Sequence, residues 1–233
     1  AAIIGGGVIG GGWAARFLLS GWDVSVFDPD PEAERKIGEV LDNARRSLPA
    51  LSDVPMPKEG TLSFVATVAE AFASPLVLSM LANDAAVTDR ITEEALRAAP
   101  AGALHVNLAT ISLETADALA ARHEKVGLRY VAAPVLGRPN VAAAGQLNIV
   151  AGGPAESVEA AREVLDVLGK AVWHVGEEAR TANLVKIGVN YNLIHTIQAL
   201  SESVTLVEAG GVDGQQFVDI LTDAAYTGSA YVG

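Results

Sequence analysis

The chain has 233 residues and carries 28 Asp and Glu against 16 Lys and Arg, a net charge of −12, with no cysteine. The acidic excess argues against a nucleic-acid backbone or an anionic membrane as the main partner, and the lack of cysteine excludes disulfides, cysteine nucleophiles and thiolate metal sites. No apolar run reaches the roughly 18 residues of a membrane-spanning helix, and the apolar start lacks the basic leader of a signal peptide. We therefore expect a cytoplasmic protein with a small-molecule substrate and no nucleic-acid partner, membrane partner or metal site. Because the first residue is Ala, we expect a few residues to precede it.

Short apolar runs and helical patterns alternate from the first residue to about residue 176. The apolar runs predict strands at 1–4, 23–27, 62–66, 75–81, 104–108, 129–134, 147–151 and 171–175. Helical spacing predicts helices at 8–20, 32–47, 67–73, 85–99, 113–125 and 155–168, and three prolines make residues 48–60 a loop. Strands separated by helices of roughly 10 to 15 residues are typical of βαβ units. We therefore expect an α/β fold with a doubly wound, mostly parallel sheet.

Strand signals stop at about residue 178, and the organisation of the chain changes there. Residues 180–210 contain no Pro and only Gly188 as an interior glycine, which predicts one long helix. A second helix is expected at about 214–224. We therefore expect two domains, 1–176 with the sheet and 177–233 with the long interdomain helix and the start of an all-α domain.

A glycine-rich turn directly follows the first predicted strand and opens a helix. The run Gly5-Gly6-Gly7-Val8-Ile9-Gly10 has the spacing G-x-G-x-x-G. Gly5 permits a tight turn, Gly7 the approach of a pyrophosphate and Gly10 the packing of helix on strand, while the free amides of the helix N-terminus face the phosphates. This predicts a Rossmann-type dinucleotide site, with cofactor contacts from Gly5, Gly7, Val8, Ile9 and Gly10. The alternative is a tightly packed glycine turn without a ligand, and a second register that starts at Gly10 lies too far into the helix.

An acidic residue ends the second predicted strand. Asp28 follows Gly10 at the distance where a carboxylate accepts hydrogen bonds from the adenosine ribose and repels a 2′-phosphate. Asp30 is the better candidate to cap the next helix, with Pro31 as its first residue, which would leave Asp28 free. We therefore expect NAD, with NADP as the less favoured cofactor.

Hydride transfer to or from a nicotinamide needs a group that exchanges a proton with the substrate oxygen. Among the histidines, His105 lies in an apolar strand and is expected in the core, and His123 is surrounded by charged residues and is expected to be solvated. His174 has no acidic partner nearby in the sequence, and His195 lies on the opposite side of the long helix from Lys186. The other candidates are the lysines and the carboxylates.

The long helix carries Asn183, Lys186 and Asn190 within roughly 60° of arc. Lys186 has apolar neighbours, and a lysine in a desolvated cleft can have its pKa lowered towards neutrality and act as a general acid or base. Asn190, one turn further, can hold a substrate hydroxyl or carbonyl. The alternative is a lysine whose stem packs on an amphipathic interdomain helix while its ammonium reaches water.

Several short motifs together carry a family resemblance. They are Leu78-Ser79-Met80-Leu81-Ala82-Asn83-Asp84, Thr110-Ile111-Ser112, Ala133-Pro134-Val135-Leu136-Gly137, Gly145-Gln146-Leu147 and Asn183-Leu184-Val185-Lys186-Ile187-Gly188-Val189-Asn190. From about residue 76 onwards the chain resembles the β-hydroxyacid dehydrogenases, the group of 3-hydroxyisobutyrate dehydrogenase and 6-phosphogluconate dehydrogenase. The resemblance implies Lys186 as general acid/base and Asn190 as a catalytic substrate ligand. It further implies nicotinamide contacts from Leu81, Ala82, Asn83 and Thr110, and substrate contacts from Thr110, Leu136, Gly137 and Arg138.

Two features depart from that family. Leu136-Gly137-Arg138 stands where the family usually has Ser-Gly-Gly, so a carboxylate-binding hydroxyl is lost, and the Arg138 guanidinium can bind a carboxylate instead. Residues 3–60 resemble the L-3-hydroxyacyl-CoA dehydrogenase type, the group of L-carnitine dehydrogenase, including its longer connection between the second and third strands. The two resemblances suggest a chimera of two branches or an unusual natural member.

The leading hypothesis is an NAD-dependent dehydrogenase or reductase of a small 3-hydroxy acid or the matching semialdehyde. The alternatives are imine or keto reduction on the same scaffold and a catalytically silent dinucleotide-binding protein. Chains of this family continue beyond the position of Gly233 into a helical domain, so the all-α part is expected to be truncated. Because the helix 180–210 is apolar on much of its surface, we expect it to pair with a second copy in a homodimer or larger oligomer.

Overall fold

The computed structural model describes the chain except residues 52–54, 139–140, 143 and 226–233. The described residues form two compact units, Ala1–Lys186 and Ile187–Gly233, whose division lies inside the long helix. The domain boundary expected near residue 176 stays a prediction. Each unit is treated separately below.

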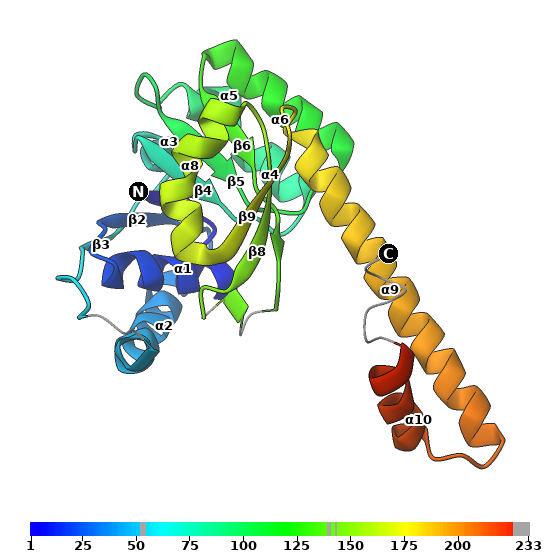
Figure 1. Cartoon of the computed structure of the whole chain (residues 1–233). Coiled ribbons are helices and arrows are strands. Elements are labelled where there is room, and N and C mark those ends of the chain that lie inside the picture. Colours follow the sequence, from blue (N-terminus) through cyan, green and yellow to red (C-terminus); the bar gives the residue numbers. More distant parts are fainter. Residues whose placement is uncertain (52–54, 139–140, 143, 226–233) are drawn as a thin grey trace. The chain divides into compact units, whose positions relative to one another are not determined.

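The first unit contains one mixed sheet (Figure 1). Its strands are β1 Ala2–Ile4, β2 Val24–Phe27, β3 Leu62–Phe64, β4 Leu76–Ser79, β5 Leu104–Asn107, β6 Arg129–Ala132, β7 Val135–Leu136, β8 Leu147–Gly152 and β9 Gly169–Gly176. The strand order is β3-β2-β1-β4-β5-β6-β8-β7, and β9 pairs with β8. Strands β1 to β6 are parallel, whereas β8 is antiparallel to β6 and β7 and parallel to β9. The order 3-2-1-4-5-6 is that of the Rossmann fold, as expected.

Helices cover both faces of this sheet (Figure 1). They are α1 Val8–Leu19, α2 Ala33–Ser47, α3 Val68–Phe72, α4 Asp84–Arg90, α5 Glu93–Leu96, α6 Leu113–Val126 and α8 Ala155–Leu168, with a 3-10 turn at Leu48–Leu51. One hydrophobic cluster joins α1, α2 and α8 to one face, and a second joins α3, α4, α5 and α6 to the other. The fold is therefore doubly wound.

Alternating side chains explain how each strand serves both faces. Ile3 belongs to the cluster under α1, whereas its neighbours Ala2 and Ile4 belong to the cluster on the opposite face. Because helices cover both faces, central strands such as β1 and β4 consist mainly of buried apolar residues. Trp13 of α1 is 1% exposed in the first cluster, and its Nε1 has no hydrogen-bond partner among the described residues.

Two predicted elements are corrected by the structure, and one strand is added. The single helix expected at 85–99 is two helices, because α4 ends at Arg90 and Thr92 starts α5 by accepting a hydrogen bond from the Ala95 amide (3.2 Å). Strand β7 was not predicted, since two residues carry no periodicity. Helix α2 begins at Ala33, after a turn in which Asp30 accepts from the Glu32 amide, so Asp30 is not its N-cap.

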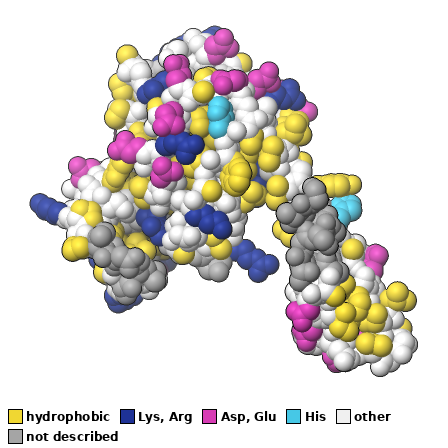
Figure 2. Space-filling view, viewed as in Figure 1, with side chains coloured by type: hydrophobic (Ala, Val, Ile, Leu, Met, Phe, Trp, Pro, Cys, Tyr) yellow, Lys and Arg dark blue, Asp and Glu magenta, His cyan; other side chains and the backbone are white. Residues whose placement is uncertain are grey.

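The second unit contains most of the long helix α9, Arg180–Ala209, followed by α10, Gly214–Ile220, and a π turn, Leu221–Ala225. Only Ala182 and Asn183 are buried in α9, and both lie in the part that belongs to the first unit. Large hydrophobic side chains are exposed on the second unit (Figure 2): Tyr191, Leu193, Ile194, Ile197, Leu206 and Ile220. Among the described residues, no helix is long and apolar enough to cross a membrane.

Candidate active site

The chain leaves the carboxyl ends of the neighbouring strands β1 and β4 towards opposite faces of the sheet. Strand β1 leads to α1 on one face of the sheet, and β4, its neighbour, leads to α4 on the other. In open α/β sheets, ligands bind in the crevice outside the carboxyl ends of the strands at such a switch point. The predicted cofactor residues of the glycine turn and of Leu81–Asn83 follow these two strands, and their role as a cofactor site stays a prediction.

The three glycines of the motif differ in what surrounds them. Gly5 has φ +100°, and a Cβ there would lie 2.3 Å from the Met80 carbonyl oxygen. A Cβ on Gly10 would lie 1.8 Å from the Gly5 carbonyl oxygen, whereas a Cβ on Gly7 would meet nothing within 4 Å. Packing therefore requires glycine at positions 5 and 10. The open space at Gly7 is room for a ligand to approach the backbone.

The N-terminus of α1 offers unpaired backbone donors beside that space. Gly7 is the N-cap, no side chain caps the helix, and its first turn contains no acidic residue. The first amides of a helix have no partner within the helix, and they attract phosphate groups. Gly7 and Val8 are exposed, Ile9 is half-buried, and Gly10 is buried. These residues fit the pyrophosphate of a dinucleotide.

Both carboxylate oxygens of Asp28 accept hydrogen bonds from backbone amides, so the expectation that this side chain is free of such bonds was wrong. One carboxylate oxygen accepts the Gly6 amide hydrogen at 2.5 Å, and the other accepts from the Asp30 amide at 2.8 Å. Asp30 itself forms an ion pair with Lys36 at 2.5 Å. Each oxygen of an ionised carboxylate has two acceptor sites. Asp28 therefore fixes the glycine turn against the β2–α2 connection and keeps acceptor capacity for a ribose.

Hydrogen bonds also join the loops that follow β4 and β5. Asn83 caps α4 by accepting from the Ala86 amide at 2.9 Å. Asp84 accepts from the Ser112 amide at 2.9 Å, and the hydrogen bonds from Ser112 hold the pKa of Asp84 below its usual value. Ser112 in turn caps α6, as predicted. Leu81 is half-buried, and Ala82, Asn83 and Thr110 are exposed.

Lys186 is the last residue of the first unit, and it lies in the second turn of α9. The side chain is half-buried, and this burial lowers its pKa. None of the ion pairs among the described residues involves Lys186. One turn earlier, the buried Asn183 side chain accepts from the Ile111 amide at 3.2 Å. Asn190 belongs to the second unit, and its role stays a prediction.

The predicted substrate residues follow β6. Leu136 lies in β7, is half-buried and packs on the hydrophobic cluster that contains Ala109, Ile111 and Ala182. Gly137 has φ +151°, and Arg138 is exposed. The guanidinium of Arg138 forms none of the ion pairs between described residues.

A pair of buried histidines joins β5, which contains His105, to α6, which contains His123. His105 is fully buried, as predicted, but His123 is only 1% exposed, and the expectation that it is solvated was wrong. His123 donates from Nδ1 to the Leu119 carbonyl at 2.7 Å, so as a neutral ring it accepts from His105 Nδ1 at 2.8 Å. His105 Nε2 then accepts from the Ser79 hydroxyl, also at 2.8 Å. Burial lowers the pKa of His123 to about 4 and lowers that of His105 as well.

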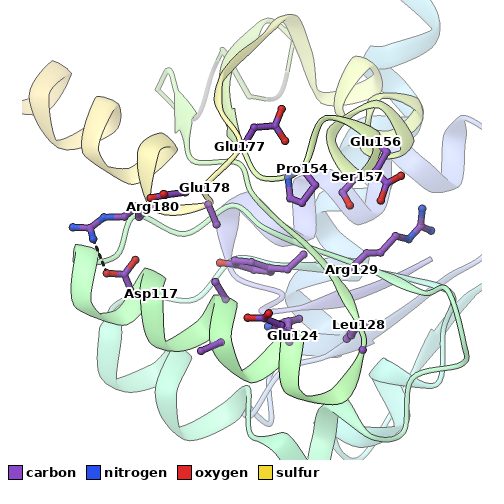
Figure 3. Close-up of a pocket in the computed structure, with 16 residues that line it drawn as sticks. Asp117, Glu124, Leu128, Arg129, Pro154, Glu156, Ser157, Glu177, Glu178 and Arg180 are labelled. Carbon is purple, nitrogen blue, oxygen red and sulfur yellow. Dashed lines mark ion pairs between the residues drawn. The ribbon is translucent and has the colours of Figure 1, made fainter.

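A separate cleft of about 640 Å³ has His123 among its lining residues (Figure 3). It is bounded by α6, the start of β6, the N-terminus of α8 and the turn before α9, and its rim carries an ion pair between Asp117 and Arg180 (2.9 Å). None of the predicted site residues lines it. In the part of the chain that the structure describes, no cluster of three or more His, Asp or Glu could hold a metal ion.

The comparison with protein families identifies the first unit. Residues 1–176 match the family described as the NAD binding domain of 6-phosphogluconate dehydrogenase. The chain belongs to this family. The match starts at β1, includes the glycine turn and ends with β9. The first unit therefore contains an NAD(P)-binding domain, and it has the Rossmann-type fold expected from the sequence.

Similar proteins carry both resemblances seen in the sequence. The chain is 34% identical over 221 residues to the uncharacterized oxidoreductase YfjR of Bacillus subtilis, covering 94% of this chain and 71% of that protein. The structure of 3-hydroxyisobutyrate dehydrogenase from Mycobacterium tuberculosis with L-serine has a TM-score of 0.80 at 25% identity, over 99% of this chain and 72% of that one. L-carnitine dehydrogenase/betainyl-CoA thioesterase of Ruegeria pomeroyi is 83% identical over 71 residues, which is 30% of this chain and 15% of that protein.

Proposed function

We propose that the chain is an NAD-dependent oxidoreductase of a small 3-hydroxy acid or the matching semialdehyde, with Lys186 as general acid/base. The observation that carries the proposal is Lys186 itself. It is a half-buried lysine without an ion pair among the described residues, one turn from an asparagine bonded to the loop after β5. Membership of an NAD(P)-binding family and similarity to a 3-hydroxyisobutyrate dehydrogenase support it.

Different residues of the first unit would bind the cofactor and transfer the proton. The amides at the start of α1 and the Asp28 carboxylate would hold the dinucleotide. When bound, the nicotinamide supplies the hydride acceptor or donor. In the oxidative direction the neutral Lys186 amine takes the hydroxyl proton while the substrate carbon gives up its hydride, and in the reductive direction the ammonium returns that proton. Because burial lowers the Lys186 pKa, more of the amine form is present near neutral pH.

The substrate end of the proposal rests on the residues after β6 and β5. Arg138 is exposed and can bind a substrate carboxylate through two parallel hydrogen bonds. The Thr110 hydroxyl lies on an exposed position between two buried residues, Ala109 and Ile111. Gly137 gives the chain the positive φ that precedes Arg138. These residues would select a small acid.

The preference for NAD over NADP rests on the negative charge of carboxylates near the proposed position of the adenosine ribose. Asp28 and Asp30 both follow β2, separated by Pro29. Among the described residues, Lys36 is the one cation bonded to either of them, and it binds Asp30. A 2′-phosphate would meet this carboxylate pair and lose affinity. Cofactor titrations with NADH and NADPH test the point directly.

Imine or keto reduction is a second candidate, favoured by Leu136. An apolar, half-buried side chain stands where the resemblance leads one to expect a carboxylate-binding hydroxyl. Acyl-CoA or carnitine oxidation is not proposed. The related chemistry uses a His–Glu pair, and no histidine of the described chain is hydrogen-bonded to a glutamate.

Turnover with a panel of 3-hydroxy acids, semialdehydes, imines, carnitine and a 3-hydroxyacyl-CoA tests these alternatives. Lys186→Ala should lower the rate with the best substrate by roughly 10²-fold or more and leave NADH affinity unchanged. Lys170→Ala is the matched control, because Lys170 is exposed and forms no ion pair with described residues. Tight NADH binding without turnover of any member would show a silent dinucleotide-binding protein.

A second copy of the chain is the proposed partner. The exposed hydrophobic side chains of the second unit include Leu193, Ile194 and Ile197, which lie within two turns of α9. Monomeric proteins rarely leave such a contiguous apolar surface in water. Pairing of α9 with its counterpart in a homodimer or larger oligomer would bury it.

A further inference from the structure

We propose that Asn183 is a positioning residue that ties the helix bearing Lys186 to the loop bearing Thr110, an inference that rests on the proposed role of Lys186. Asn183 is fully buried, and its side-chain oxygen accepts the Ile111 amide hydrogen at 3.2 Å. The two residues are 72 positions apart in the sequence, so the bond joins separate elements. The bond also connects the helix that carries the proposed acid/base Lys186 to the loop that carries the proposed substrate ligand Thr110.

The loop after β5 is held from two other directions. The Leu108 amide donates to the Ser79 carbonyl of β4 at 2.9 Å, and the Ser112 amide donates to Asp84, at the start of α4, over the same distance. Within the described chain, Ile111 is the loop residue whose amide is bound from α9. Asn183 thus supplies the connection of the loop to the catalytic helix.

Helix geometry makes this bond a constraint on Lys186. Lys186 lies three positions after Asn183, a rise of about 4.5 Å along the axis and an angle of roughly 60° around it. The two side chains therefore leave nearly the same side of α9. An anchor at Asn183 fixes the rotation of this helix turn about its axis, and with it the direction in which the Lys186 stem leaves the helix.

The unpaired nitrogen of the Asn183 amide indicates that packing alone does not explain this residue. Asn183 Nδ2 is buried and has no hydrogen-bond partner among the described residues. An unpaired buried donor is unfavourable, and leucine, which has the same branched outline, would avoid that cost. The side chain is therefore explained by what its oxygen holds, the Ile111 amide, rather than by packing alone.

Hydrogen exchange of the Ile111 amide measures its hydrogen bond to Asn183 without any catalytic assay. We expect slow exchange in the wild-type protein and fast exchange in Asn183→Leu, which keeps the branched shape and removes the acceptor. The Leu108 amide, bonded to Ser79, is the internal reference and should stay protected in both. Asn192→Leu is the matched control, because Asn192 is an exposed asparagine of the same helix.

Kinetics then test whether the tie positions Lys186. Misplacement of a catalytic group by about 1 Å can cost 10²-fold in rate, so we expect Asn183→Leu to lower kcat by roughly tenfold or more at an unchanged KM for NADH. Asn183→Asp keeps an acceptor oxygen and should recover Ile111 protection and part of kcat. A variant in which Ile111 exchanges fast while kcat stays at the wild-type value would overturn the proposal, and so would unchanged protection of Ile111.

The outcomes separate this proposal from the one on which it rests. Loss of turnover in every variant together with a lowered melting temperature would indicate misfolding, and Asn183→Ala, which leaves a smaller side chain and no acceptor, then repeats the exchange test. Absence of turnover by the wild-type protein would overturn the proposed function, and the role of Asn183 with it. Wild-type turnover that Asn183→Leu leaves intact would overturn the role of Asn183 alone.

Discussion

Gly7 and Gly12 are the two glycines near the start of α1 whose Cβ atoms would meet nothing within 4 Å. Gly7 precedes the helix at the proposed pyrophosphate position, whereas Gly12 lies within the helix. Gly7→Ala should therefore weaken NADH binding by roughly tenfold, about 1.4 kcal/mol, without loss of stability. Gly12→Ala should leave NADH binding unchanged and stabilise the helix by up to about 1 kcal/mol. Fluorescence titration and thermal unfolding measure the two effects, and equal NADH affinity in Gly7→Ala and the wild type would contradict the assignment.

Asp28 is the residue on which the proposed cofactor preference depends. Asp28→Asn keeps a side-chain oxygen acceptor for the Gly6 amide but removes the negative charge near the ribose. We expect NADH to bind more weakly and NADPH more tightly than to the wild type, so that the ratio of the two dissociation constants narrows by at least roughly tenfold. Equal use of NAD and NADP by the wild-type protein would show that Asp28 does not select the cofactor.

The buried histidine pair makes stability depend on pH. The pKa of His123 is about 4 in the folded state against 6.5 as its ordinary value, so between these values the unfolded chain binds a proton that the folded chain does not. This contribution to stability is complete above about pH 6.5 and is lost as the pH falls towards 4, by an amount on the order of 3 kcal/mol.

Urea unfolding at pH 7.5 and pH 5 tests the histidine contribution. His123→Gln should flatten the decrease between the two pH values, whereas His195→Gln should not, because His195 is exposed. A decrease of the same size in His123→Gln and the wild type would mean that other groups cause it.

At the scale of the elements, apolar periodicity was sufficient for most of the fold. It predicted the strands β1 to β6 because most of their residues are apolar, and β1 and β4 are almost fully buried. It failed at residues 85–99, where the Thr92 cap divides an amphipathic stretch into α4 and α5. His123 was misjudged from its charged neighbours, although its spacing from Ala116 and Leu119 puts it on the buried face of α6.

The glycine turn and the edge of the sheet at which it lies were also predictable, because the motif is local. The contacts that organise the rest of the site were not. Asp84 and Ser112 are 28 residues apart, and Ile111 and Asn183 are 72 apart, so neither spacing carries a signal. Likewise, that Asp28 is bound by the Gly6 amide depends on how two loops approach each other in space.

Helix α6 begins at a capping serine that also lies beside the proposed site. Ser112 accepts from the Thr115 amide at 3.2 Å, and its own amide donates to Asp84. Ser112→Ala should lower the free energy of unfolding by about 1 kcal/mol through loss of the cap. Ser201→Ala is the control, since Ser201 is exposed within α9. Denaturant unfolding measures both changes, and equal stabilities would argue that the cap contributes nothing.

At the scale of the whole molecule, sequence identity to known proteins is much higher in one segment than along the whole chain. One segment of 71 residues is 83% identical to part of a carnitine dehydrogenase, whereas identity to the oxidoreductase YfjR is 34% over 221 residues. High identity in one segment and moderate identity along the chain is the pattern expected when segments of two sources are joined. This pattern agrees with the chimera suggested by the sequence.

Oligomerisation is the prediction that belongs to this scale. If α9 pairs with its counterpart, light scattering at micromolar concentration should give at least twice the mass of 24.0 kDa. Ile194→Asp puts a charge on an exposed hydrophobic position and should shift the mass towards that of the single chain, while Ser201→Asp, at a polar position of the same helix, should not. A stable monomer of the wild-type protein would contradict the proposed pairing.

Trp13 gives the protein an optical reporter of its own. Its indole is buried in the hydrophobic cluster under α1, and its Nε1 has no hydrogen-bond partner among the described residues, whereas Trp173 is 58% exposed. An indole in such surroundings fluoresces at shorter wavelength than one in water, and indole emission overlaps the absorption band of a reduced nicotinamide. Trp13 also lies on α1, the helix whose N-terminus is proposed to receive the pyrophosphate. Resonance energy transfer should therefore quench the blue side of the emission spectrum when NADH binds, so that the unlabelled protein reports its own saturation.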